Sequence, residues 1–169
     1  MPNRSITSKA RSGSVQLADC LSSLLALELM YPGPEIYLIS PWISNVSLLS
    51  NRFGQFRPVM DDGRKGDLRL AAILTLLAER GVKVRVMCRP RHQQTEEFLN
   101  LLPENVERRS SETLHEKGLI TYHFYLRGSM NFTYSGINLN DERVELTTDS
   151  QDVALALIEA RQRWEALPL

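Results

Sequence analysis

This sequence of 169 residues has no net charge, few cysteines and no long apolar run. Lysine and arginine together number 20, and aspartate and glutamate also number 20. A chain with this balance does not bind nucleic acid by bulk electrostatic attraction, so any such binding must be local. The longest apolar stretch, Leu21 to Tyr31, is interrupted by Ser22, Ser23 and Glu28 and is too short to cross a bilayer. We therefore expect no membrane span and no membrane partner.

The two cysteines offer neither a disulfide framework nor metal-ligand spacing. Cys20 lies in an apolar helical stretch and Cys88 at the end of an apolar strand, so we expect two buried free thiols in a reducing cytoplasm. The start of the chain lacks the apolar core and the small-residue cleavage site of a secretory signal, which also favours a cytoplasmic location. No cluster of histidine, cysteine, aspartate and glutamate has the spacing of a metal site. We expect no metal and no cofactor.

The composition is that of an ordinary globular domain. Hydrophobic residues make up 43% and charged residues 24%, and a chain of this length buries roughly 70% of its unfolded surface. The sequence contains no internal repeat that would indicate a second domain. It predicts one domain over residues 13–169, preceded by a flexible tail over residues 1–12.

Apolar periodicity predicts alternating helices and strands. Leucines at helical spacing indicate a helix over 14–30, and the run EIYLISPW indicates a buried strand over 35–42. An amphipathic helix over 67–80 with Asp67 as its N-cap precedes a strand over 82–88. Strand, crossover helix and strand form a βαβ unit, which implies a parallel pair. We predict an α/β fold with a mixed, largely parallel sheet and helices on both faces. Further elements are expected over 95–102 (helix), near 106 (strand) and over 152–167 (amphipathic helix).

A polar insertion over residues 45–66 separates the first strand from the helix that follows it. Long loops in small domains are commonly functional. Arg57, Arg64 and Lys65 are interleaved there with phenylalanines, so they are candidate substrate-binding residues that grip a phosphate backbone while the rings stack on bases. A solvated surface insertion is the alternative.

Two further arginines, Arg89 and Arg91, come directly after the second strand of the predicted parallel pair. Ligand sites in α/β sheets commonly lie at the carboxyl ends of such strands, so both are candidate substrate-binding residues. His92 and His123 fall in polar segments and are expected at the surface, without a catalytic role.

Two pairs of polar residues further along the chain have the same spacing. His115 and Lys117 are two apart, and so are Ser129 and Asn131. On a strand this spacing puts both side chains of a pair on one face. An imidazole, an ammonium, a hydroxyl and a carboxamide that meet at one point can bind a phosphate oxyanion and supply a nucleophile. A lone His115 would be interpreted as a buried structural histidine, but the set favours catalysis.

This stretch resembles the signature of the phospholipase D superfamily, most of all its short, single-motif bacterial nuclease branch. The matching residues are His115-x-Lys117 followed by Gly128-Ser129-x-Asn131-Phe132-Thr133. The likeness covers nearly the whole chain apart from the N-terminal tail and the insertion. It implies a phospholipase D-like domain and a metal-independent phosphodiesterase that cleaves nucleic acid. DNA is expected ahead of RNA, although the phosphate chemistry common to both does not separate them.

The resemblance also assigns roles to five residues. It implies that His115 attacks phosphorus to form a phosphohistidine, while its counterpart from a second motif protonates the leaving group. Lys117 and Asn131 would bind the non-bridging oxygens, with Ser129 as a nearby hydroxyl. Glu142 lies eleven positions after the asparagine, where the family has a glutamate, and would accept a bond from the His115 ring.

The motif occurs once in this chain, whereas the implied mechanism uses two histidines and two lysines. A single-motif chain is therefore expected to form a homodimer with its active site on the two-fold axis. Small bacterial proteins that look like this one resemble parts of DNA-processing or defence systems, so other subunits of such a system are possible partners by resemblance.

The sequence departs from the family pattern at Tyr122, where an aspartate would stand. We interpret the change as altering a turn at the far end of the strand and not as removing a catalytic group. The alternative is a catalytically impaired nucleic-acid-binding or assembly subunit. Phospholipid hydrolysis shares the chemistry, but no stretch of the sequence has the pattern of a membrane-binding segment.

Overall fold

The structure is a computed structural model, and it describes residues 3–8, 14–51, 53–54 and 66–168. The candidate substrate-binding residues Arg57, Arg64 and Lys65 lie outside the described residues, so their role stays a prediction. Among the helices that are described, none is long and apolar enough to span a bilayer.

Within the described residues, seven strands form one mixed sheet in the order β1-β9-β8-β7-β2-β5-β6. β2 pairs in parallel with β5, and β5 with β6, whereas every other neighbouring pair is antiparallel. The strands are β1 (Arg4–Ser8), β2 (Glu35–Ile39), β5 (Lys83–Cys88), β6 (Glu107–Ser110), β7 (Gly118–Thr121), β8 (Tyr125–Gly128) and β9 (Glu142–Thr147).

The predicted mixed α/β fold is confirmed, and the predicted parallel pair is β2 with β5. The sheet is not largely parallel, however. Residues 122–124 form the short turn between β7 and β8, and such a turn reverses the chain direction instead of crossing over the sheet. A longer connection over residues 129–141, which contains a helix, joins β8 to β9, and this pair is antiparallel too. The prediction recognised the βαβ unit and the turn at Tyr122, but it did not include the antiparallel pairing of β7, β8 and β9.

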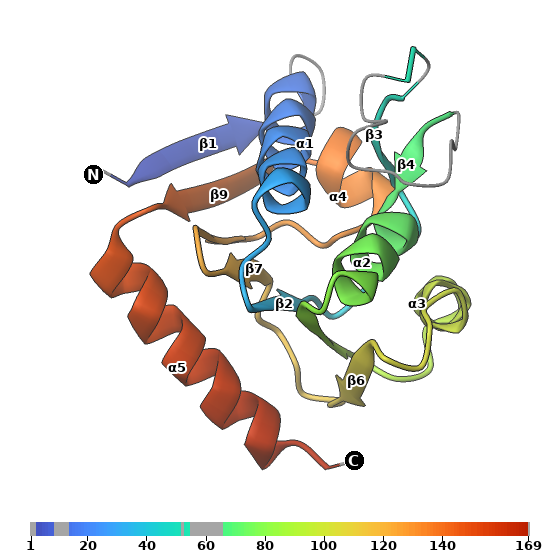
Figure 1. Cartoon of the computed structure of the whole chain (residues 1–169), viewed down its shortest axis with the longest axis vertical. Coiled ribbons are helices and arrows are strands. Elements are labelled where there is room, and N and C mark those ends of the chain that lie inside the picture. Colours follow the sequence, from blue (N-terminus) through green and yellow to red (C-terminus); the bar gives the residue numbers. More distant parts are fainter. Residues whose placement is uncertain (1–2, 9–13, 52, 55–65, 169) are drawn as a thin grey trace.

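Helices cover both faces of the sheet, as predicted. Figure 1 shows α1, α2 and α4 together on one side and α5 on the other. Alternate residues of each strand face opposite sides, so β2 sends Leu38 into the core under α1 and α2, and Tyr37 and Ile39 toward Trp164 of α5. The helices are α1 (Ser14–Met30), α2 (Leu70–Glu79), α3 (Gln93–Asn100), α4 (Tyr134–Asn138) and α5 (Ser150–Ala166).

The start of α2 differs from the prediction. The helix begins at Leu70, and Asp67 is not its N-cap. Asp67 instead accepts a hydrogen bond of 3.2 Å from the hydroxyl of Ser47, at the start of a small antiparallel pair. This pair consists of β3 (Ser47–Leu49) and β4 (Leu68–Arg69), which lie at the two ends of the predicted insertion. The pairing joins segments about twenty residues apart in sequence, so no local pattern indicates it.

Residues 4–8 also differ from the prediction of a flexible tail. They form β1, which pairs antiparallel with β9 at the edge of the sheet, with Ile6 opposite Val144. A single apolar residue in this segment carries no strand signal of its own. The pairing with β9, at the other end of the chain, is what orders it.

Candidate active site

The residues of the motif meet at one edge of the sheet, which is formed by the ends of its strands. His115 and Lys117 precede β7, Ser129 follows β8, and Glu142 begins β9. The carboxyl ends of β2 and β5 lie at the same edge, because β7 is antiparallel to β2 and β2 is parallel to β5. We call this edge the motif edge. It comprises Ser40, Arg89, His115, Lys117, Ser129, Asn131 and Glu142.

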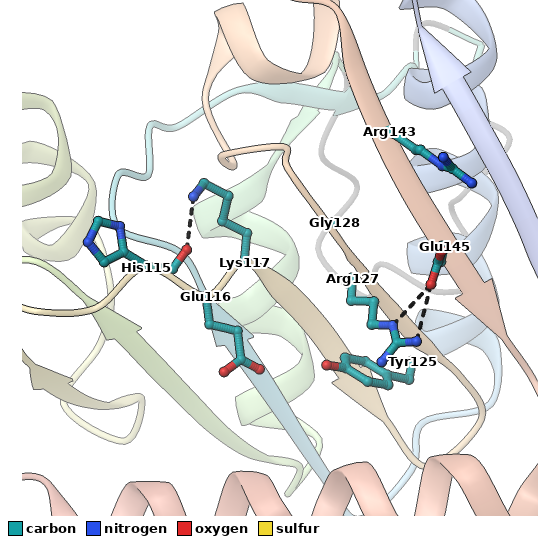
Figure 2. A pocket seen from close by; sticks show the side chains of 8 residues that line it. All are labelled: His115, Glu116, Lys117, Tyr125, Arg127, Gly128, Arg143 and Glu145. Atoms are coloured by element: carbon teal, nitrogen blue, oxygen red, sulfur yellow. Dashed lines mark hydrogen bonds and ion pairs between the residues drawn. The ribbon is translucent and has the colours of Figure 1, made fainter.

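His115 and Lys117 lie in an extended segment and not within a strand as predicted, because β7 begins only at Gly118. The pairing of the hairpin nevertheless continues past the strand, since the amide of Gly128 donates to the carbonyl of Lys117 at 3.3 Å. The Lys117 ammonium folds back and donates to the carbonyl of His115 at 2.9 Å (Figure 2). The His115 ring is exposed and points away from the strand.

Arg89 is the neighbour of the His115 ring. Its Nη2 lies 2.9 Å from Nδ1 and 3.0 Å from Nε2 of the imidazole, and its Nε donates to the carbonyl of Leu114 at 2.6 Å. Of the two candidate arginines after β5, the fold therefore brings Arg89 to the motif. Arg91 pairs instead with Glu112 at 2.7 Å, and both side chains of that pair are largely exposed.

Glu142 is buried and engages Ser129, whose hydroxyl donates to its Oε2. Asn140 Nδ2 donates to the other carboxylate oxygen at 3.4 Å. Both nitrogens of the His115 ring contact Arg89, so the predicted bond from this ring to Glu142 stays a prediction. Ser129 is thus held at a defined place, since its hydroxyl also accepts from the amide of Arg143 at 3.0 Å.

Asn131 is positioned by Ser40, a residue that the sequence analysis missed. The Ser40 hydroxyl is buried and lies 3.3 Å from Asn131 Oδ1, and it accepts from the amide of Phe132 at 3.2 Å. The available signal was a polar residue at the end of the apolar run EIYLIS. A buried hydroxyl needs a partner, so such a residue often lies beside another polar group.

Gly128 is required where β8 meets the motif. Its φ is +155°, and a Cβ added there would lie 2.1 Å from the carbonyl oxygen of Arg143. Any side chain would therefore collide with the β9 backbone. The glycine permits the close approach that carries Ser129 toward Glu142.

A cavity of about 400 Å³ opens at the motif edge, on the side of the sheet that α5 covers. Its two glutamates have cationic partners: Glu145 pairs with Arg127 at 3.1 Å, and Glu116 with Arg163 of α5. Lys117 donates to a carbonyl and Arg143 to a serine hydroxyl, and both of these acceptors are uncharged. The cavity therefore has two cations in addition to its ion pairs and suits an anion. Figure 2 shows the residues that line it, namely His115, Glu116, Lys117, Tyr125, Arg127, Gly128, Arg143 and Glu145.

Two ionisable groups near the site have pKa values displaced by burial. Burial raises the pKa of the Tyr125 hydroxyl in the cavity wall, so the phenol stays neutral. Burial also raises the pKa of Cys88, directly before Arg89, to about 11. Cys88 is a buried free thiol, as predicted, whereas Cys20 is free but only half-buried. Neither the Tyr125 phenol nor the Cys88 thiol is a nucleophile at neutral pH.

Tyr122 lies at the opposite end of β7, in the turn before β8. The turn is closed by Thr121, whose hydroxyl accepts from the amides of His123 at 3.0 Å and Phe124 at 3.2 Å. The position where the family has its aspartate is therefore remote from His115 along the strand.

Within the described part of the chain, no group of three histidine, cysteine, aspartate or glutamate residues gathers as a metal site would. The arrangement at the motif edge combines an exposed imidazole, cations and hydrogen-bond donors. Such a set can stabilise a phosphorane-like transition state.

Comparisons with known proteins agree with this description. A family model described as "Cardiolipin synthase, PLD-like domain", where PLD stands for phospholipase D, matches residues 64–164, which is more than half of the chain. None of the curated proteins matches the chain.

Several solved structures share the fold. NucT from Helicobacter pylori is 15% identical, with a TM-score of 0.62 over 98% of both chains. Nuc from Salmonella typhimurium, a phospholipase D family member, is 14% identical, with a TM-score of 0.62 over 99% of this chain and 97% of its own. Polyphosphate kinase from Porphyromonas gingivalis is 13% identical, with a TM-score of 0.63 over 94% of this chain and 26% of its own. At these identities the likeness shows the fold alone.

Proposed function

The chain belongs to the family of phospholipase D-like domains, and we propose that two copies of it form a metal-independent nuclease. The observation that carries the proposal is the meeting of His115, Lys117 and the Gly128–Ser129–Asn131 segment at one sheet edge, beside a cavity that suits an anion. The structural likeness to NucT and Nuc supports a phosphodiester of nucleic acid as the substrate. DNA ahead of RNA stays a prediction from the sequence.

The proposed reaction has two steps. A ring nitrogen of His115 attacks phosphorus, so that a P–N bond forms and the bond from phosphorus to the leaving oxygen breaks. His115 of the partner subunit gives its proton to that oxygen. In the second step, His115 of the partner subunit takes a proton from water. The water oxygen attacks phosphorus and the P–N bond breaks, which restores both histidines.

Lys117 and Asn131 bind the non-bridging oxygens in this proposal, because both present donors at the motif edge. Arg89 joins them as a substrate-binding residue, since its guanidinium already lies within 3.0 Å of the attacking ring. A bidentate guanidinium matches a phosphate better than it matches an imidazole, so phosphate can draw it off the ring. The ring is then free to turn toward Glu142. Arg91 and the insertion residues Arg57, Arg64 and Lys65 remain proposed contacts to phosphates further along the strand.

We propose the α5 side of the sheet as the dimer surface. The motif cavity opens on this side, and a second hollow of about 240 Å³ adjoins it, since Tyr125 and Arg127 line both. Leu155 of α5 lines this second hollow and is exposed. A second copy that packs its own α5 here would cover Leu155 and bring the two His115 rings together.

The first experiment is cleavage of labelled single- and double-stranded DNA and RNA in excess EDTA. His115→Ala, purified in the same way, controls for contaminating nuclease. We expect chelator-resistant cleavage by the parent protein and none by the variant. Vesicles that contain phosphatidylglycerol form a separate arm, because the family description names a lipid enzyme. Turnover of lipid without turnover of nucleic acid would contradict the proposed substrate.

The dimer is tested with Leu155→Glu, which places a charge on the proposed surface. We expect its mass by light scattering to fall from dimer to monomer, and cleavage to fall with it. Leu101→Glu changes another exposed leucine, directly after α3, and should leave both unchanged. A parent protein that cleaves as a monomer would refute the shared active site.

A second candidate is a nucleic-acid-binding or assembly subunit without turnover, within a DNA-processing or defence system. Two observations favour it: Arg89 occupies the His115 ring, and Glu142 is engaged by Ser129. Rapid quenching separates the two functions. Formation of an acid-labile phosphoenzyme supports the nuclease, and tight binding without that intermediate supports the second candidate.

A further inference from the structure

An exposed aromatic pair lies beside the motif edge and has no part in the mechanism above. The Trp42 ring is 42% exposed, and its centroid lies 5.7 Å from that of His92, with the planes tilted by 31°. The other tryptophan, Trp164, is only 2% exposed and belongs to the core under α5.

Trp42 is tied to the motif through its own backbone. Its carbonyl accepts a hydrogen bond of 2.7 Å from Ser40, the residue whose hydroxyl also contacts Asn131. On the other side, the amide of Arg89 donates to the carbonyl of Pro41 at 3.0 Å. The residue before Trp42 therefore contacts Arg89. Trp42 itself is hydrogen-bonded to Ser40, which positions Asn131.

The partner ring is equally close to the site in the chain. His92 lies three residues after Arg89, which contacts the His115 ring. The buried hydroxyl of Thr95 lies 2.9 Å from His92 Nδ1 and accepts from the amide of Ile43 at 3.0 Å. One buried group thus fixes both segments that carry the rings, so the pair is a preformed surface.

A third aromatic residue, Tyr134, is exposed on the adjoining segment. Ile43 pairs in parallel with Phe132, directly after Asn131. The amide of Tyr134 donates to the hydroxyl of Ser44 at 3.3 Å. The segments that carry Trp42 and Tyr134 therefore run side by side, and each starts at a residue of the motif edge.

We infer that Trp42 is a stacking platform for a nucleobase next to the scissile phosphate, an inference that rests on the proposed nuclease function. Nucleobases stack on exposed aromatic rings, and each base contributes on the order of 1–3 kcal/mol. Cationic Arg89 and Arg91 lie on the segment that leads to His92 and attract the neighbouring phosphates. A base inside a duplex cannot reach such a surface without leaving its stack, so the substrate is an unpaired strand.

Tryptophan fluorescence tests this inference in His115→Ala protein, which binds without cleaving. Because Trp164 is buried, quenching by a ligand reports on Trp42. We expect a single-stranded oligonucleotide to quench the emission, and an abasic strand of equal length and charge to leave it unchanged. Trp42→Ala should weaken binding of the base-containing strand about tenfold and leave binding of the abasic strand unchanged, whereas Trp42→Phe should stay within about threefold of the parent.

Tyr122→Ala is the matched control, since Tyr122 is also exposed but lies at the far end of β7. It should change neither the quenching nor the affinity. Equal weakening of both strands by Trp42→Ala, or conversion of the dimer to a monomer, would overturn the platform while the nuclease activity stands. Base-dependent quenching by a parent protein that never cleaves would leave the platform standing and overturn the nuclease.

Discussion

The two ends of the β7–β8 hairpin satisfy their polar groups in different ways. At the turn end, the Thr121 hydroxyl accepts from two amides of the turn itself, and His123 Nε2 lies 2.9 Å from the carbonyl of Tyr31. At the motif end, the Lys117 ammonium and the Arg89 guanidinium rest on carbonyls and on a ring, which are weaker partners for a cation than a phosphate. The polar groups of the turn end are bound within the fold, whereas the cations of the motif end would gain a stronger partner from a phosphate.

This difference explains why the departure at Tyr122 need not abolish function. The turn that contains Tyr122 already has its acceptor in Thr121, so an aspartate is not needed there to hold the amides. The comparison therefore predicts that substitutions at the motif end lower turnover, and that substitutions at the turn end have little effect on turnover.

The largest expected effect comes from comparing two histidines at the two ends. His115→Ala should lower the rate of cleavage by about a thousandfold or more, because His115 supplies the attacking nitrogen in the proposed reaction. His123→Ala should stay within about twofold of the parent, since His123 contacts only the turn end. Initial rates on one oligonucleotide measure both. Equal losses in the two variants would remove the distinction between the ends.

A smaller effect is expected from comparing two glycines. Gly128→Ala forces a Cβ to within 2.1 Å of a backbone oxygen of β9 and should lower the free energy of unfolding by about 2–4 kcal/mol. Gly33→Ala would place its Cβ 2.7 Å from the Cβ of Tyr122 and 3.5 Å from its backbone nitrogen, a milder overlap than at Gly128, and should cost about 1–2 kcal/mol. Urea unfolding measures both values. A larger cost at Gly33 would show that the turn end is the more rigid of the two.

The smallest effect is expected from restoring the residue of the family pattern. Tyr122→Asp should leave kcat within about threefold of the parent, because the position lies beyond the far end of β7 from His115. Its kcat and KM are compared with those of Tyr122→Ala. A gain of tenfold or more with aspartate alone would mean that the parent chain is catalytically impaired.

Much of the fold was predictable from local pattern. The helix over 14–30 was predicted with the bounds that α1 has, because a long run of leucines at helical spacing has one interpretation. Both strands of the parallel pair were also predicted. A strand that ends in a turn at Tyr122 was predicted as well, but its antiparallel pairing with β8 was not, since each of the two strands has only four residues and is flanked by the polar motif. The strand at residues 4–8 depends on β9, which no local signal reveals.

The candidate site was predictable only in part. The spacing of His115 with Lys117 and of Ser129 with Asn131 indicated one site, and the hairpin brings both pairs to the motif edge. The neighbour of the ring was predicted as Glu142, whereas Arg89 occupies that place. Arg89 was predicted to bind substrate and not to contact the His115 ring, because the sequence gives no distance between these two residues.

The sequence by itself determined the family, since the residue types and their spacing of two are those of the phospholipase D motif, and it predicts a nucleophile with donors for a phosphate. Only the tertiary structure decided which groups support them. Arg89 is 26 positions from His115, and Ser40 is 91 positions from Asn131. Such contacts follow from the order and register of strands in the sheet, which depend on the packing of the whole core and not on any local period.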